Sequence, residues 1–138
     1  MRNGSDAIAL TRALSLQGLI PELSPPFVRT SPVRIPELNN VALTRRTLRL
    51  IDHPDFQRLR RVKQLGPTHW VYPGAVHTRF EHSNGVFSCV RNYLLALLQD
   101  PLFAEKVAEK DLLTALAAGL LHDLGHYPFA HSLEALHH

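Results

Sequence analysis

Apolar residues recur every three or four positions along much of the chain, which is the spacing of helices that bury one face. The clearest case runs from about residue 78 to 99, where the apolar positions are Phe80, Val86, Phe87, Val90, Leu94, Leu97 and Leu98. Pro101 favours the start of a short helix that ends near Ala108. Asp111 is the expected N-cap of the next helix, which leads through an apolar stretch into His122 and Asp123.

The first half of the chain shows the same helical spacing of apolar residues, and the opposite face of each predicted helix is basic. Residues 41–51 predict a helix that carries three arginines, and residues 54–65 predict another with apolar residues at three-residue intervals. Gly66 and Pro67 end the second helix. Residues 33–38 favour a short strand or extended segment, and residues 129–136 favour a last helical piece. The predicted fold class is therefore all-α, a mostly helical domain with minor short strands.

The start of the chain is weakly specified. Residues 7–19 favour a short amphipathic helix, but Gly18 and the prolines at positions 21, 25, 26 and 32 break any regular element between this helix and residue 33. We expect residues 1–33 to form a loosely ordered N-terminal arm and residues 34–138 to form the folded domain.

The composition is that of a globular protein. The 138 residues are 45% hydrophobic and 20% charged, and no run approaches the ~20 apolar residues of a membrane span. The chain does not open with the pattern of a signal peptide. Cys89 is the one cysteine, which excludes an internal disulfide and a metal cage built from cysteines. We therefore expect a cytoplasmic protein that does not contact membranes.

Charge is unevenly distributed along the chain. Residues 1–63 hold 11 Lys and Arg against 5 Asp and Glu, whereas residues 64–138 hold 4 against 7. The basic first half favours an anionic partner, either a nucleotide phosphate or a nucleic acid. A solvated helix face explains the same arginines equally well.

Candidate metal ligands gather in the sequence LLHDLGHYPFAH at residues 120–131. The apolar residues before His122 and Asp123 predict burial, and a buried imidazole or carboxylate needs a metal or a partner charge to compensate it. Adjacent helical residues point about 100° apart, so both reach one ion only where the helix ends. Gly125 and Pro128 favour such an end. A His-Asp pair alone is common, so a further ligand must come from elsewhere in the chain.

Three blocks of the sequence resemble a known family. They are IDHPDFQRLRRVKQLGPTHWVYPGAVHTRFEHS at 51–83, HTRFEHSNGV at 77–86 and LLHDLGHYPFAHSLE at 120–134. In these blocks the chain is similar to the HD superfamily of metal-dependent phosphohydrolases, and most similar to the branch that contains dNTP triphosphohydrolases. The resemblance runs from about Arg34 to the last residue, so residues 34–138 look like the N-terminal part of an HD domain.

The resemblance implies a metal shell. His82, His122 and Asp123 match the family's ligands for a divalent metal ion, which could be Fe, Zn, Mn or Mg. Three protein ligands leave a position for water or a phosphate oxygen. In the family an Asp from a later helix completes the set, whereas here Glu134 is the last carboxylate side chain. We therefore expect this chain to be the first part of a longer domain and to be inactive by itself.

The resemblance also implies catalytic residues. His126 and His131 match histidines beside the substrate phosphates. His131 would act as a general acid or as a group that activates the phosphate, since imidazole titrates near neutral pH. Glu134 matches the acidic residue that pairs with that histidine, where a carboxylate would orient the ring and raise its pKa.

Substrate-binding residues are implied in the same way. Arg79 matches a residue that contacts the triphosphate, where a guanidinium fits phosphate geometry. Gln64 and Leu65 match positions that touch the sugar and base. Arg58 and Arg60 align with a basic region that binds activating nucleotides between subunits in some members.

The function implied is hydrolysis of a dNTP to a deoxynucleoside and inorganic triphosphate, with a homo-oligomer as the assembled form. One alternative is a phosphodiesterase or nuclease-like HD protein, in which the basic segment 45–63 holds a nucleic-acid strand. A second alternative is a truncated, non-catalytic remnant that binds only metal or nucleotide. Of the two anionic partners, we expect a nucleotide rather than a nucleic acid.

Overall fold

The computed structural model describes residues 3–24, 33–35, 39–41 and 43–128 of the chain. The elements are α1 (Asn3–Leu19), β1 (Val33–Ile35), β2 (Asn39–Val41), α2 (Arg45–Ile51), α3 (Pro54–Gln57), the 3-10 helices η1 (Arg58–Arg61) and η2 (Gly66–Trp70), α4 (Arg79–Leu97), α5 (Pro101–Lys106) and α6 (Glu109–Leu121). The described part is mostly helical, which confirms the predicted fold class. No helix within these ranges is long and apolar enough to cross a membrane. The helix predicted over residues 129–136 lies outside them.

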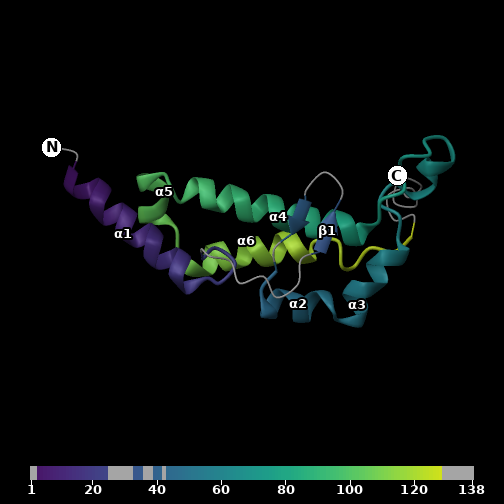
Figure 1. The fold of residues 1–138 in the computed structure, drawn as a ribbon, viewed down its shortest axis with the longest axis horizontal. Helices are drawn as coiled ribbons and strands as arrows, with labels where there is room; N and C mark the ends of the chain where they lie inside the picture. Colours follow the sequence, from purple (N-terminus) through teal and green to yellow (C-terminus); the bar gives the residue numbers. More distant parts are fainter. Residues whose placement is uncertain (1–2, 25–32, 36–38, 42, 129–138) are drawn as a thin grey trace, which may run out of the picture.

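Helices α4 and α6 form the centre of the molecule, where they lie side by side (Figure 1). They run in opposite directions, because the short helix α5 reverses the chain between them. A Cβ atom added at Gly119 of α6 would lie 3.0 Å from Cγ2 of Val90 in α4, so glycine permits this close approach. The antiparallel arrangement brings the end of α6 to the beginning of α4.

The other elements surround this pair. Helix α1 packs against α5, and η1 packs against α4. The two strands pair antiparallel, with Val33 opposite Val41, and lie against α4. The buried core includes residues from nearly every helix and from the turn after α1. Among them are Leu16, Ile20, Leu23, Ile51, Phe56, Leu59, Phe80, Phe87, Leu112, Leu116 and Leu120. The helix expected over residues 7–19 is confirmed within α1, while the proposed division at residue 33 stays a prediction.

Helix α4 closely follows its predicted bounds, because its start is fixed by a capping box. Oγ1 of Thr78 accepts from the backbone N–H of Glu81, and the Glu81 carboxylate accepts from the backbone N–H of Thr78. The end of α5 is also close to prediction, at Lys106.

Three other predicted bounds are wrong. The helix predicted from residue 41 begins at Arg45, because Thr44 forms the cap and Val41 pairs in β2. The helix predicted over 54–65 ends at Arg61 as a 3-10 turn. Val62 is extended instead, and its carbonyl accepts from the backbone N–H of Arg79. Asp111 lies inside α6 rather than at its N-cap, with its carboxylate accepting from the N–H of Ala108.

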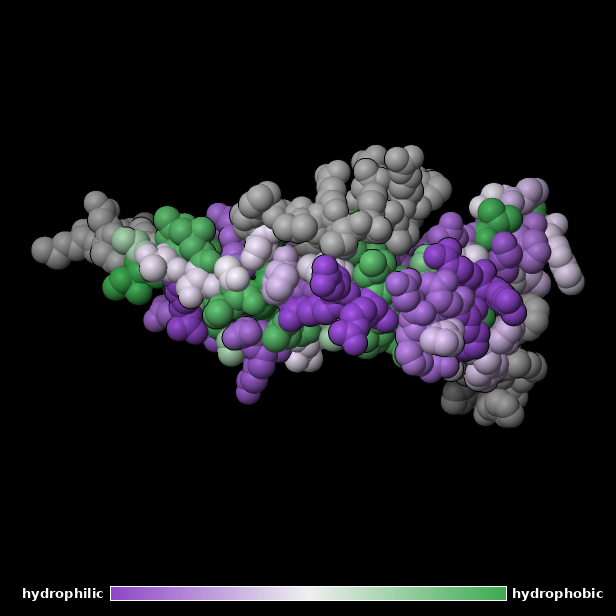
Figure 2. Space-filling model, turned by 60° about the horizontal axis from the view of Figure 1, so that its bottom comes forward, coloured by the Kyte–Doolittle hydropathy of each residue, from purple (hydrophilic) through white to green (hydrophobic). Residues whose placement is uncertain are grey.

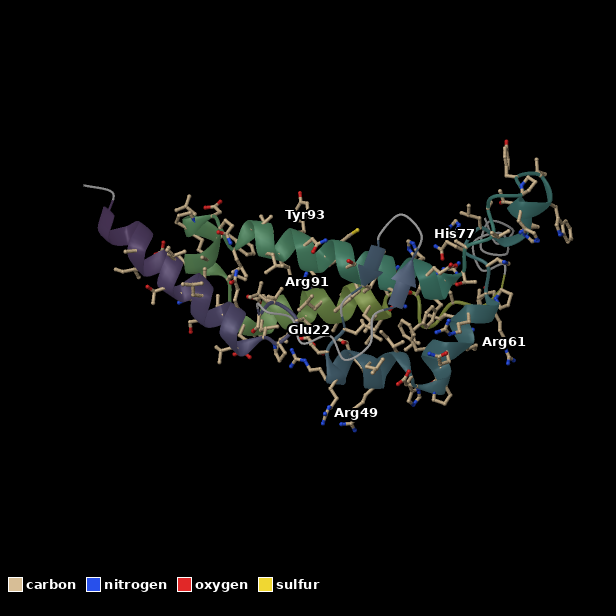
Figure 3. All side chains as sticks on the ribbon, viewed as in Figure 1. Glu22, Arg49, Arg61, His77, Arg91 and Tyr93 are labelled. Atoms are coloured by element: carbon tan, nitrogen blue, oxygen red, sulfur yellow. The ribbon has the colours of Figure 1, made fainter. Side chains whose placement is uncertain are left out.

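The surface is mixed in character. Apolar side chains of α1, including Ile8 and Leu14, are exposed, and green patches mark this end of the molecule beside a strongly hydrophilic face over α2 and α3 (Figure 2). Arg49 and Arg61 point away from the helices into solvent (Figure 3).

Candidate metal centre

The candidate site forms where the beginning of α4 meets the end of α6. His82 lies in the first turns of α4, after the capped start at Thr78. Helix α6 ends at Leu121, and His122 is its C-cap, at the start of a turn through Gly125. The predicted helix end before Gly125 is therefore confirmed, and it allows two adjacent side chains to turn toward α4.

The residues His82, His122 and Asp123, which we name the His-Asp cluster, offer ligand atoms that all lie within 4.8 Å of one another. Nε2 of His82 lies 4.0 Å from Oδ2 of Asp123, and Nε2 of His122 lies 3.6 Å from Oδ1 of the same carboxylate. The two imidazole rings meet edge to face with their centroids 5.2 Å apart. Residues 40 positions apart in the sequence thus converge at one point.

The donor set fits a first-row divalent metal. In a tetrahedral shell two metal–ligand bonds of about 2.1 Å place their donor atoms about 3.4 Å apart. The most distant donor atoms, which lie within 4.8 Å of one another, would therefore have to move together by up to about 1.4 Å when the ion binds. Nδ1 of His122 lies 3.1 Å from the carbonyl oxygen of Gly119. Because a carbonyl only accepts, the ring proton sits on Nδ1 and leaves the Nε2 lone pair for a metal. Nitrogen and carboxylate donors together suit Fe, Zn or Mn.

The protonation state of His82 also suits a metal ligand. Burial lowers the pKa of His82, and this effect exceeds the opposing influence of the Asp123 carboxylate. A histidine with a lowered pKa is neutral at neutral pH, and only the neutral ring can bind a metal.

Arg79 places a buried positive charge beside the cluster. Its side chain is 2% exposed, and Nη1 lies 3.0 Å from Oδ2 of Asp123, whose side chain is 5% exposed. The two atoms form an ion pair without the alignment of a hydrogen bond. Nε of Arg79 is buried and also has no hydrogen-bond partner among the described residues. Such unsatisfied groups are rare in folded proteins and are typical of functional sites.

The structure brings one of the three predicted catalytic residues into the site. Nδ1 of His126 lies 3.3 Å from Oδ1 of Asp123, and the His126 side chain is 27% exposed. His131 and Glu134 lie outside the described residues, so their roles stay predictions.

Gln64 and Leu65, which we predict to contact the base and sugar, lie beside the start of α4. The backbone N–H of Gln64 donates to the carbonyl of His77, and Lys63 forms an antiparallel β-bridge with Thr78, the N-cap of α4. Oε1 of Gln64 is buried without a partner in the described part of the chain, whereas Leu65 is 48% exposed. Their contact with a substrate stays a prediction.

One contact at the site, made by Arg58, could not be predicted from the sequence. The guanidinium of Arg58 donates to two backbone carbonyls in the turn after α6, those of Leu124 and His126. These residues are more than 60 positions away, and neither spacing nor residue type links them.

Comparison with known proteins assigns a family to the part of the chain that holds this cluster. The family model described as HD domain matches residues 79–138, a range that contains all three members of the His-Asp cluster. The deoxynucleoside triphosphate triphosphohydrolase SAMHD1 of Mus musculus is 50% identical over 92 residues, which are 63% of this chain and 13% of that protein. SAMHD1 of Danio rerio is 42% identical over 114 residues, or 79% of this chain and 18% of that protein.

A bacterial relative and a solved structure extend the comparison. The uncharacterized protein YwfO of Bacillus subtilis (strain 168) is 47% identical over 93 residues, which cover 64% of this chain and 20% of that protein. The crystal structure of a hypothetical protein from Aquifex aeolicus superposes with a TM-score of 0.62 at 43% identity, covering 77% of this chain and 26% of that one. The chain thus spans about a fifth or less of the curated relatives named here.

Residues 79–138 of the chain belong to the HD-domain family. Within that family the chain is similar to proteins named as dNTP triphosphohydrolases. The expected resemblance is thereby confirmed.

Proposed function

We propose that this chain supplies the metal-binding part of a phosphohydrolase that converts a deoxynucleoside triphosphate and water into a deoxynucleoside and inorganic triphosphate. The observation that carries the proposal is the convergence of His82, His122 and Asp123, with the Arg79 cation beside them. The similarity to two SAMHD1 proteins named for this reaction favours the substrate.

Nε2 of His82, Nε2 of His122 and a carboxylate oxygen of Asp123 would hold the metal ion. When bound, such an ion supplies Lewis acidity toward a phosphate oxygen and lowers the pKa of a water molecule. Water contributes its oxygen to the α-phosphorus, and the bond from that phosphorus to the 5′ oxygen breaks. The 5′ oxygen leaves with a proton, for which His131 is the predicted donor.

The protein's own residues would neutralise charge and position the phosphates. Phosphoryl transfer depends mainly on positioning and electrostatic stabilisation. Arg79 would donate hydrogen bonds from its guanidinium to the triphosphate. Its Nε has no hydrogen-bond partner among the described residues, which supports this role. His126 would hold a phosphate oxygen while its other nitrogen faces Asp123. Gln64 and Leu65 would contact the nucleoside.

Product analysis with dGTP and Mn²⁺ tests the proposal on a full-length HD-domain protein that carries this chain, because we expect the 138 residues to be inactive by themselves. Equal amounts of deoxyguanosine and inorganic triphosphate are expected, and Asp123→Asn should abolish both. Asp52→Asn, which changes an exposed carboxylate outside the cluster, should leave both unchanged. Release of pyrophosphate with nucleoside monophosphate would contradict the reaction. Shortening of single-stranded DNA without triphosphate release would instead support the phosphodiesterase alternative.

A further inference from the structure

Arg58 joins two distant parts of the chain next to the proposed metal site. Nη1 donates to the carbonyl oxygen of His126 at 2.9 Å, and Nη2 donates to that of Leu124 at 2.8 Å. One planar guanidinium thus bridges two carbonyls of the turn that contains Asp123. A fork of two donors fixes orientation as well as position.

The turn that Arg58 holds has few other backbone supports. After α6 ends, the N–H of Leu124 donates to Leu121 at 3.0 Å and the N–H of His126 donates to Asp123 at 3.1 Å. The last carbonyls of a helix and those beyond it lack helical partners, and a nearby cation stabilises them through the helix dipole as well. Arg58 supplies both the donors and the charge.

The backbone that carries Arg58 is anchored by its neighbours, while the Arg58 side chain itself is exposed. Its neighbour Leu59 is fully buried, and Phe56 two residues earlier is 1% exposed. The guanidinium of Arg60 stacks over the ring of Phe80 in α4 at 3.6 Å from the centroid. The 3-10 helix η1 is therefore fixed to α4, the same helix that carries His82.

We propose that Arg58 is a positioning residue for the proposed metal site: it fixes the turn of residues 122–126 against η1, so that Asp123 and His126 keep their orientation toward His82. The inference rests on the function proposed for this chain. It differs from the activator-nucleotide role that the resemblance implies for this arginine, because Nη1 and Nη2 each donate to a backbone carbonyl of this chain and not to a nucleotide.

The proposal predicts a change in metal affinity without a change of any ligand. Residues that orient metal ligands alter affinity by roughly 10- to 100-fold when they are replaced. Arg58→Ala should therefore weaken Mn²⁺ binding by roughly that factor in equilibrium dialysis of the full chain. Arg58→Lys keeps the charge but not the planar fork, so it should recover only part of the affinity. Arg61→Ala removes an exposed arginine of the same 3-10 helix and should change nothing.

Hydrogen exchange of the metal-free chain separates a local from a general effect. Arg58→Ala should speed exchange of the Leu124 and His126 amides by roughly tenfold, with exchange in the middle of α4 unchanged. Wild-type affinity in Arg58→Ala, or equally faster exchange throughout the chain, would overturn the proposal. If the wild-type chain binds no metal, the proposed function is wrong. The proposal that Arg58 positions the metal site is then wrong as well. The exchange measurement then still shows whether Arg58 holds the turn.

Discussion

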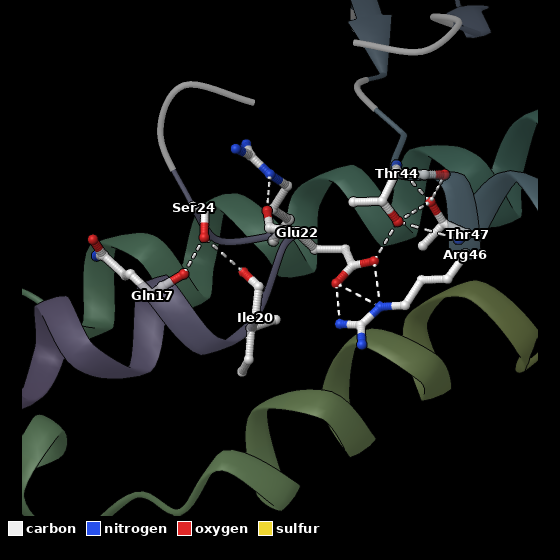
Figure 4. Close-up of polar contacts among 8 residues, drawn as sticks. Gln17, Ile20, Glu22, Ser24, Thr44, Arg46 and Thr47 are labelled. Carbon is white, nitrogen blue, oxygen red and sulfur yellow. Dashed lines mark hydrogen bonds and ion pairs between the residues drawn. The ribbon is translucent and has the colours of Figure 1, made fainter. Parts of the chain in front are cut away.

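Two polar clusters of this molecule, each built around one buried carboxylate, differ in how completely their hydrogen-bonding groups are satisfied. At Glu22, both carboxylate oxygens accept from Arg46, Oε1 also accepts from Thr44, and the backbone carbonyl accepts from Arg91 (Figure 4). We call these four residues the Glu22 network. In the His-Asp cluster, Oδ2 of Asp123 is buried with no hydrogen bond from any described residue.

The difference distinguishes a structural cluster from one built to bind. Each buried polar group left without a partner destabilises a fold by about 1–3 kcal/mol, whereas a satisfied network stabilises it. The Glu22 network joins the end of α1 to α2 and α4, and its bonds are complete within the protein. In the His-Asp cluster the buried oxygen Oδ2 of Asp123 accepts no hydrogen bond from the described part of the chain, so it is able to coordinate a bound ion. Substitutions in each cluster should therefore separate stability from metal binding.

Asp123→Asn should have the largest effect, because it removes both a ligand and the counter-charge of buried Arg79. We expect Mn²⁺ affinity to fall by about 100-fold or more. The free energy of unfolding should fall by about 3 kcal/mol, because the guanidinium stays buried without a partner charge. Dialysis and urea unfolding measure the two effects. Unchanged affinity would remove Asp123 from the ligand set.

His82→Ala should affect binding alone. No side-chain hydrogen bond holds this ring among the described contacts, and it is 35% exposed. We expect the free energy of unfolding to change by less than about 1 kcal/mol, while Mn²⁺ affinity falls by about 100-fold. His77→Ala, an exposed histidine five residues earlier, is the matched control. Retained affinity in His82→Ala would show that α4 contributes no ligand.

Glu22→Gln should produce the opposite result. It removes the charge that holds Arg46 and Thr44, so we expect a loss of about 2 kcal/mol in the free energy of unfolding. Mn²⁺ affinity should not change. Glu105→Gln, on the exposed surface of α5, controls for loss of a carboxylate. A loss of metal binding in Glu22→Gln would mean that the two clusters are coupled.

The smallest effect concerns acid stability. Burial would raise the pKa of Glu22, but the hydrogen bonds from Arg46 and Thr44 outweigh it, so its pKa lies below the ordinary value of 4.5. Between the folded pKa and 4.5 the unfolded chain binds more protons, so stability falls as pH drops through this window. Unfolding at a series of pH values should show a steeper loss below pH 4.5 in the wild type than in Glu22→Gln. Equal slopes would contradict a lowered pKa.

The sequence predicted those features that depend on local signals. The bounds of α4 are set by apolar spacing and by Thr78 and Glu81, which form a cap within four residues. The break after Leu121 is explained by Gly125 and Pro128. The grouping of His82 with His122 and Asp123 came from the family resemblance, and the antiparallel packing of α4 on α6 accounts for it physically.

Features that depend on distant contacts could not be predicted. Residues 62–64 have helical spacing but do not continue the helix, because the backbone of Val62 bonds to Arg79 and that of Gln64 bonds to His77. Val41 has an equally helical context but pairs with Val33. The ion pair of Arg79 with Asp123 and the bonds of Arg58 to the turn after α6 join residues more than 40 positions apart. Tertiary packing decides each of these cases.

We propose that one ion is shared by two helix ends, and anomalous scattering from crystals of the Mn²⁺-loaded full chain tests this most directly. We predict a single strong anomalous peak bonded to Nε2 of His82, Nε2 of His122 and a carboxylate oxygen of Asp123. A peak bonded to His122 and Asp123 but out of reach of His82, or no peak at this place, would contradict the account.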